Sequence, residues 1–224
     1  NESMPLRRVA PRVRLLTALA TLIAFAGCSS AYYSAMEQIG QHKRDILRSR
    51  IESGQEDQQE AQEQIKSTYE RFKEAAKYDG GDFERVYNDL NGEYEDAVAR
   101  AEDVSDRIES IEQVAADLFA EWQQEIGLYQ SASIRRESEK SLRDTQRRYE
   151  KLITAMKRAE SKMPPVLNAF RDQVLFMKHS LNARAIAALE GTVGEIESDV
   201  ANLIRDIDAS IREAESFLDQ FESA

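Results

Sequence analysis

Apolar residues recur along most of this chain at alternating spacings of four and three, which is the 3.5-residue period of helices that pack as a left-handed supercoil. The clearest run lies within residues 82–128 and is uninterrupted. No segment shows the strict apolar–polar alternation of a half-buried strand. The pattern therefore predicts an all-α protein whose core is lined by residues of this kind: Phe83, Tyr87, Leu90, Tyr94, Ala97, Ala101, Val104, Ile108, Ile111, Ala115, Leu118 and Trp122.

Turn sequences divide the periodic runs into four helices. The clearest turn is Asp79-Gly80-Gly81-Asp82, because glycine can adopt a positive φ at a helix end and Asp82 is a good N-cap. A serine-rich stretch places the next turn within 127–133, with Ser131 or Ser133 capping the third helix; the alternative is one uninterrupted helix, which would leave three. The predicted helices span about 30–78, 82–128, 133–181 and 183–221.

Pro164-Pro165 lies inside the third predicted helix. Each proline lacks an N–H donor, so the pair must kink or break the helix, and the uninterrupted phase of the apolar stripe favours a kink. With the reversal at 179–182, the first three helices are each about 70 Å long at 1.5 Å per residue. The sequence thus predicts an elongated antiparallel bundle of four long, coiled-coil-like helices. Gly191 and Gly194 indicate close packing of the last one.

The apolar stripe thins in the first helix between Ile51 and Ile65, where Gly54, Gln58 and Ala61 occupy the seam. Small residues there indicate a close approach of two helices, and Gln58 indicates a polar layer in the core. A docking site for a partner is the third interpretation. The two structural interpretations are favoured.

The first 27 residues have the features of a bacterial lipoprotein signal peptide. Four arginines precede the apolar segment Leu15 to Ala26, whose 12 residues are too few to cross a bilayer, which needs about 20. The segment ends in Leu22-Ile23-Ala24-Phe25-Ala26-Gly27-Cys28, the pattern of a lipobox. Cys28 is the only cysteine in the chain. We therefore predict removal of residues 1–27 and acylation (palmitate) of Cys28, with one domain at 28–224. Tyr32 and Tyr33 would then lie at headgroup level or form the first core layer.

Residues 28–224 contain 40 acidic and 26 basic residues, a net charge of −14. Such a surface argues against binding to nucleic acid, which needs basic patches. The charge is unevenly distributed: residues 82–129 carry −11 and residues 134–163 carry +5. We expect these helices to be neighbours that pair through flanking charges. Alternatively, the basic run binds an anionic polymer or headgroup; it comprises Arg135, Arg136, Lys140, Arg143, Arg147, Arg148 and Lys151.

Motifs that carry chemistry are missing from the sequence. The two histidines, His42 and His179, lack the Glu-x-x-His spacing of di-iron bundles. His-Glu-x-x-His, Cys-x-x-Cys and a phosphate-binding glycine loop do not occur. We therefore expect a protein that is not an enzyme and has no catalytic residues, metal or cofactor.

Several segments of the mature chain resemble one family. They are Ala-Tyr-Tyr-Ser-Ala-Met-Glu after the lipobox, Ala-Glu-Asp-Val-Ser-Asp-Arg-Ile, Asp-Leu-Phe-Ala-Glu-Trp and, most distinctively, residues 169–186. Over essentially the whole mature chain the sequence is similar to the DUF2959 family of bacterial lipoproteins, whose function is uncharacterised. The resemblance implies no activity, but it draws attention to 169–186, where polar groups crowd a bend. The candidate interaction patch there is Arg171, Asp172, Lys178, His179, Asn182 and Arg184.

These features favour a structural or adaptor lipoprotein of the periplasm that binds an envelope protein or the cell wall. Ser29, in place of an aspartate after the cysteine, favours the inner leaflet of the outer membrane of a Gram-negative cell. The alternative is a module that binds a ligand or metal between helices, at 54–61 or near 169–186. A hydrolase with an unfamiliar site is the third hypothesis. The sequence predicts no oligomeric state.

Overall fold

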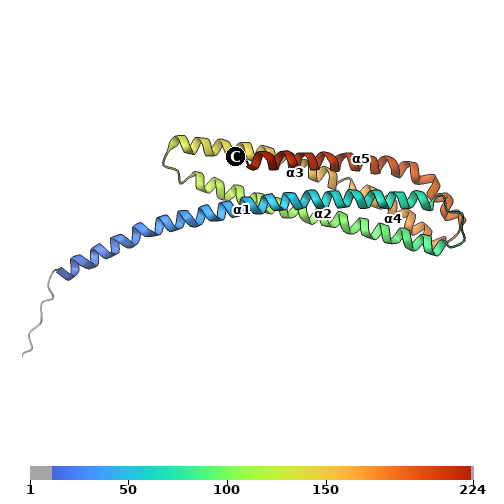
Figure 1. Cartoon of the computed structure of the whole chain (residues 1–224), viewed down its shortest axis with the longest axis horizontal. Coiled ribbons are helices and arrows are strands. Elements are labelled where there is room, and N and C mark those ends of the chain that lie inside the picture. The colour runs from blue at the N-terminus through green and yellow to red at the C-terminus, as the bar shows by residue number, and fades with distance from the viewer. Residues whose placement is uncertain (1–11, 223–224) are drawn as a thin grey trace, which may run out of the picture. The chain divides into compact units, whose positions relative to one another are not determined.

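The computed structural model describes the backbone of residues 12–222 and the side chains of residues 42–221. The side chain of Cys28 and the beginning of the predicted signal peptide lie outside these limits. The chain divides into two units, residues 1–43 and 44–224, and the bundle is the second unit. The helices are α1 (Arg12–Ala75), α2 (Phe83–Ile126), α3 (Ala132–Glu160), α4 (Met163–His179) and α5 (Ala183–Glu222) (Figure 1).

The part of α1 beyond residue 43, α2, α3 with α4, and α5 form the four legs of an antiparallel bundle. Contacts between the legs fix their register. From α1, Asp57 Oδ2 lies 2.7 Å from Arg107 Nε of α2, and Gln62 Nε2 donates to Asp208 Oδ1 of α5 at 2.7 Å. Helix α5 also packs along α3 and α4. The predicted all-α bundle is confirmed, and residues 12–222 contain no strand.

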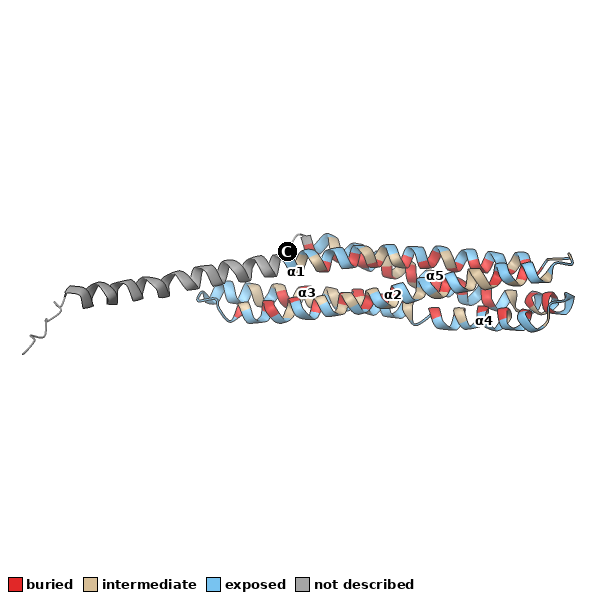
Figure 2. Cartoon of the chain, turned by 90° about the horizontal axis from the view of Figure 1, so that it is seen from below, coloured by how far each residue is buried: buried red, intermediate tan, exposed pale blue. Residues whose placement is uncertain are grey.

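The core of the bundle is a continuous row of apolar side chains on the inward side of each helix (Figure 2). Most of the predicted stripe residues are buried, including Ile51, Ile108 and Met156, which are at most 1% exposed. The stripes missed Leu47, Val86 and Phe217, which are also buried, while Leu181 lies in a turn and is exposed. Among the described residues, no helix is long and apolar enough to span a membrane.

The third leg bends where α3 gives way to α4. Helix α3 ends at Glu160 and α4 begins at Met163, so the interruption at Ser161-Lys162 precedes the prolines. Pro164 and Pro165 lie in the first turn of α4, where an N–H would have no partner within the helix. The two helices continue in one direction as a single bent leg (Figure 1). The predicted kink is therefore confirmed, and it costs little because the prolines occupy the positions that tolerate them.

The turn after α1 corrects the expected role of its glycines. Neither Gly80 nor Gly81 has a positive φ, so neither ends the helix in a left-handed conformation. Gly80 instead makes room for Tyr78: a Cβ at Gly80 would lie 2.5 Å from the tyrosine Oη. That hydroxyl accepts a hydrogen bond from the backbone N–H of Asp82 at 3.1 Å, and Asp82 caps α2 as predicted by accepting from Arg85 N.

The second turn also lies where the sequence placed it, at the opposite end of the bundle (Figure 1). Helix α2 ends at Ile126, and Gly127 N–H bonds to Gln124 O at 3.1 Å. Ser131, one of the two predicted caps, precedes α3 and accepts from Ile134 N–H. The alternative of one uninterrupted helix is therefore wrong.

The glycines of the bundle divide into one that packs closely and others that do not. A Cβ at Gly54 would lie 3.0 Å from both Ile111 Cδ1 and Met156 Cε, so Gly54 marks the predicted close approach of helices. A Cβ at Gly191 or Gly194 would meet nothing within 4 Å. The expectation that these two pack closely is wrong, because both lie on the exposed side of α5.

We expect the double change Gly191→Ala and Gly194→Ala to raise the free energy of unfolding by about 1–2 kcal/mol, since alanine loses less backbone entropy in a helix and meets open space. Gly54→Val should lower it by about 1–3 kcal/mol, because the side chain would overlap its neighbours. Urea unfolding followed by circular dichroism measures both. Destabilisation by the alanines would contradict the placement of α5.

Candidate interaction surface

The six residues of the predicted patch lie around the hairpin between α4 and α5, at the end of the bundle that also holds the turn after α1 (Figure 1). We call this the far end, and the end with the α2–α3 turn the near end. All six are exposed. Their polar contacts are local: Arg171 Nε lies 3.7 Å from Asp172 Oδ1, and Asn182 Oδ1 accepts from Arg184 N–H at 2.9 Å. Asn182 therefore caps the start of α5, and the patch does not converge on a ligand.

An apolar surface lies among these polar residues. Leu175, Phe176 and Leu181 are 45, 40 and 43% exposed, and we call them the far patch. Val174 and Met177, which alternate with them on α4, are buried in the core. Leu175 and Phe176 share the outer face of α4 with Asp172 and His179, since residues three and four apart are neighbours on a helix. The sequence contained this signal, because two large apolar residues fall outside the core stripe.

The charges around the far patch are mainly positive. Arg171, Lys178 and Arg184 surround it, against one carboxylate, that of Asp172. Arg171 and Asp172 form a loose exposed pair, which contributes little to stability. Lys178 and Arg184 form no ion pair with another described residue. An apolar centre with a polar, cationic rim is the composition of a protein-binding surface.

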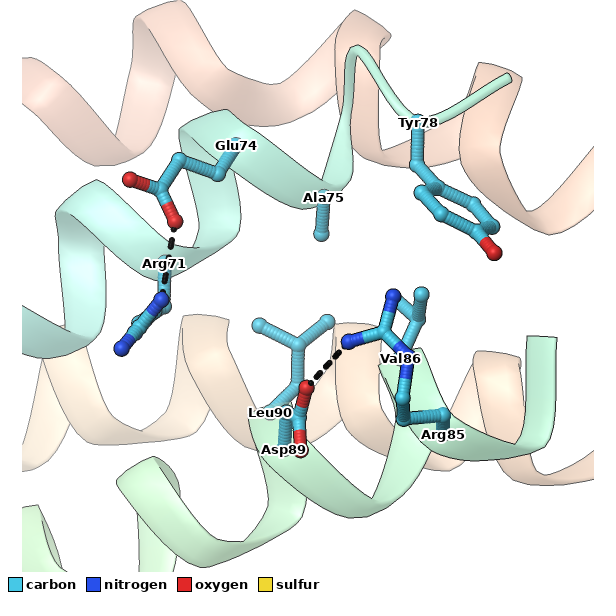
Figure 3. A pocket seen from close by; sticks show the side chains of 8 residues that line it. All are labelled: Arg71, Glu74, Ala75, Tyr78, Arg85, Val86, Asp89 and Leu90. Atoms are coloured by element: carbon cyan, nitrogen blue, oxygen red, sulfur yellow. Dashed lines mark hydrogen bonds and ion pairs between the residues drawn. The ribbon is translucent and has the colours of Figure 1, made fainter. Parts of the chain in front are cut away.

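A hollow of about 180 Å³ lies near the far end between α1 and α2 (Figure 3). Its charged side chains pair within their own helices: Arg71 Nη1 lies 3.0 Å from Glu74 Oε2, and Arg85 Nη1 lies 3.0 Å from Asp89 Oδ2. Tyr78 closes one side, with the Arg85 guanidinium 5.7 Å from its ring centre. The hollow is smaller than the roughly 300–1,000 Å³ of ordinary ligand sites. Its cations are already partnered, so it supports no binding role.

The thinned stripe at 54–61 is packed core. Gly54 is covered by Ile111 and Met156, and Gln58 and Ala61 are both 0% exposed. Neither amide atom of Gln58 has a hydrogen-bond partner among the described residues. These residues form a polar layer with helices in close approach, as the structural interpretations predicted. Within the described side chains, no group of three His, Cys, Asp or Glu is arranged to hold a metal ion.

The basic run of α3 does not pair with α2 as expected. Its ion pairs are internal to α3, between Arg143 and Glu139 at 3.9 Å and between Arg147 and Asp144. Helix α3 does pair with its neighbours, but farther along: Lys157 Nζ lies 2.5 Å from Glu112 Oε1 of α2, and Arg158 Nε lies 3.0 Å from Asp206 Oδ1 of α5. Opposite net charges thus predicted the neighbouring helices, but not the residues that pair.

Comparison with known proteins gives one match. A search of curated proteins found no match, and a search of solved structures found none. A family model described as "Protein of unknown function (DUF2959)" matches residues 32–221, which include the whole bundle and the far patch. The chain belongs to the DUF2959 family.

Proposed function

We propose that this protein is a non-enzymatic scaffold of the cell envelope, anchored by a lipid on Cys28 and binding another envelope protein through the far patch. The observation that carries the proposal is the exposure of Leu175, Phe176 and Leu181 at one end of an otherwise closely packed bundle. Exposed apolar residues gathered in one place and rimmed by polar ones mark interaction sites.

The chemistry of the far patch describes the partner. Burial of a leucine and a phenylalanine favours an apolar pocket or groove, and the cationic rim of Lys178 and Arg184 favours carboxylates around it. Helix α2 alone, with 44 residues, is about 66 Å long at 1.5 Å per residue. The bundle would therefore present the far patch tens of ångströms from the end at which the chain enters it.

Binding through the far patch predicts that Leu175→Ser with Phe176→Ser removes the partner. Serine takes away the apolar area while leaving the buried side of α4 unchanged, so the bundle should stay folded. Quantitative mass spectrometry of material purified from crosslinked cells should show at least a tenfold loss of one envelope protein, about 1.4 kcal/mol. The matched control is Leu128→Ser with Ile134→Ser, exposed apolar residues at the near end. Equal recovery from both variants would overturn the proposal.

The lipid anchor is tested by Cys28→Ser. A serine lacks the thiol that accepts the lipid, and without acyl chains the acidic bundle has no strong hold on a bilayer. We expect the variant to move from the membrane fraction to the soluble fraction and to retain its uncleaved leader. Unchanged membrane fractionation and unchanged electrophoretic size would dismiss the anchor.

A further inference from the structure

We infer that the hairpin between α2 and α3 makes a second contact with the membrane, placing apolar side chains among the headgroups and cations on the lipid phosphates. The inference rests on the proposed lipid anchor at Cys28, which would hold the near end of the bundle close to the bilayer. It goes beyond the anchor because it assigns a lipid-binding surface to the folded domain itself.

The hairpin displays apolar side chains at its tip. Leu128, Tyr129 and Ile134 are 39, 38 and 52% exposed, and we call them the near tip. None of the three belongs to the core clusters of the bundle. Tyrosine and large aliphatic residues are favoured at the membrane interface, where the apolar part of the side chain is buried and the polar end stays hydrated.

The near tip is ordered by hydrogen bonds within the hairpin. Arg135 Nη2 donates to Tyr129 O at 2.7 Å, and Leu128 N–H donates to Glu125 O at 2.9 Å. Arg135 N–H also bonds to Ser131 O at 3.0 Å. The apolar side chains are therefore held outward by a defined loop, which reduces the conformational entropy that binding to a surface would cost.

Cations stand beside the near tip without a protein partner of opposite charge. Arg136 and Lys140 are exposed on the first turns of α3 and form no ion pair with any described residue. Arg143, one helical turn on from Lys140, has only the 3.9 Å contact with Glu139. Each such residue near an anionic bilayer contributes about a fivefold gain in binding. This arrangement supplies the headgroup role that the basic run left open.

The connection to Cys28 selects the near end of the bundle. Arg44, the first residue of the bundle unit, lies over Trp122 at 4.3 Å from the ring centre and over Phe221 at 5.8 Å. Trp122 is held in turn by its Nε1–H, which donates to Ser138 Oγ at 2.9 Å. Burial in this layer lowers the pKa of Arg44, an effect that nearby Glu125 opposes. The chain thus enters the bundle one or two helical turns from the near tip.

The reach of the connecting segment permits the contact. Fifteen residues separate Cys28 from Arg44, which is about 22 Å if helical and about 50 Å if extended. The near tip lies about 9 Å beyond the layer of Arg44 and Trp122, given six residues of rise between positions 122 and 128. The far patch is farther away by most of the length of α2, so an anchored bundle can bring only the near tip to the surface.

A pair of single-cysteine labels tests the contact. With Cys28 acylated, Ala132→Cys and Ala183→Cys each introduce one reactive thiol, and each replaces an exposed alanine at the first residue of a helix that follows a turn. The lipidated protein is reconstituted in vesicles of phosphatidylethanolamine and phosphatidylglycerol and labelled with a polarity-sensitive fluorophore. We expect a blue shift and quenching by nitroxide-headgroup lipids at position 132, and neither at position 183.

Charge variants complete the test. Arg136→Gln with Lys140→Gln should lower the ratio of bound to unbound near tip about 25-fold at position 132, at fivefold for each cation. The matched change at the far end, Lys178→Gln with Arg184→Gln, should leave that quenching unchanged. Protein that floats with the vesicles while position 132 reports water would overturn this inference and leave the anchor standing. Protein that does not float at all would overturn the anchor itself.

Discussion

Replacing Phe170 by alanine is expected to lower the free energy of unfolding by about 3–5 kcal/mol, the cost of removing a buried aromatic side chain and leaving a cavity. Phe170 is 0% exposed. Its ring stacks on that of Phe72 with centroids 4.9 Å apart and planes 24° from parallel, so it joins α4 to α1. The position lies in the bent leg, where the core has to be maintained just after the interruption at Ser161-Lys162.

The matched control is Phe176→Ala, six residues along the same helix. Phe176 is 40% exposed, so its loss should change the free energy of unfolding by less than about 1 kcal/mol. Urea unfolding of both variants, followed by circular dichroism, makes the comparison. Equal losses from the two substitutions would contradict the orientation of α4, and with it the assignment of the far patch to the surface.

Replacing Gln58 by methionine is expected to raise the free energy of unfolding by about 1–3 kcal/mol. Gln58 is 0% exposed, and neither amide atom has a hydrogen-bond partner among the described residues. Burying such a group costs free energy that is recovered when an unbranched apolar side chain takes its place. Methionine suits the position because it is unbranched and flexible, as glutamine is.

The surroundings of Gln58 strengthen this expectation. Gln55 Nε2 donates to Ile211 O at 3.2 Å and Gln62 Nε2 donates to Ile204 O at 3.4 Å, so Gln58 lies level with the intervening turns of α5. Ser210 is in that stretch, is 0% exposed, and its hydroxyl also has no partner among the described residues. Two polar core positions at the same level leave a layer that costs stability and that disfavours other registers of the helices.

Gln59→Met provides the control for Gln58→Met. Gln59 is exposed, and its side chain makes a 3.3 Å hydrogen bond to Glu63 Oε1 on the surface of α1. Its substitution should change the free energy of unfolding by no more than about 0.5 kcal/mol. A loss of stability in Gln58→Met would mean that the buried amide is hydrogen-bonded in solution, and that the polar layer stabilises the fold instead of costing stability.

The architecture could be predicted from the sequence because the spacing of apolar residues is a local property of each helix. The period of α2 placed Ile108 and Leu118 in the core, and the turn residues Asp82 and Ser131 located the helix starts. The pairing of specific charges could not be predicted in the same way. It depends on the rotation of each helix about its axis, which brings Lys157 to Glu112 and leaves Arg136 facing solvent.

The glycines show the same limit. Gly54 and Gly191 both interrupt helical patterns, yet one is enclosed by Ile111 and Met156 and the other faces open space. Gly80 is needed by a tyrosine side chain that folds back over the turn, and not by a positive φ. In each case the role depends on what lies opposite in space. For the site, the patch of polar residues was placed correctly at a bend, but the apolar side chains among them carry the proposed binding.

The measurement that tests the central proposal most directly is photo-crosslinking in living cells from single positions on the bundle. A photoreactive amino acid at Phe176, in the far patch, is compared with one at Glu109, on the exposed face of α2. The proposal predicts one discrete crosslinked envelope protein from position 176, lost when Leu175 is also changed to serine, and none from position 109. The same products from both positions, or products only from position 109, would contradict it.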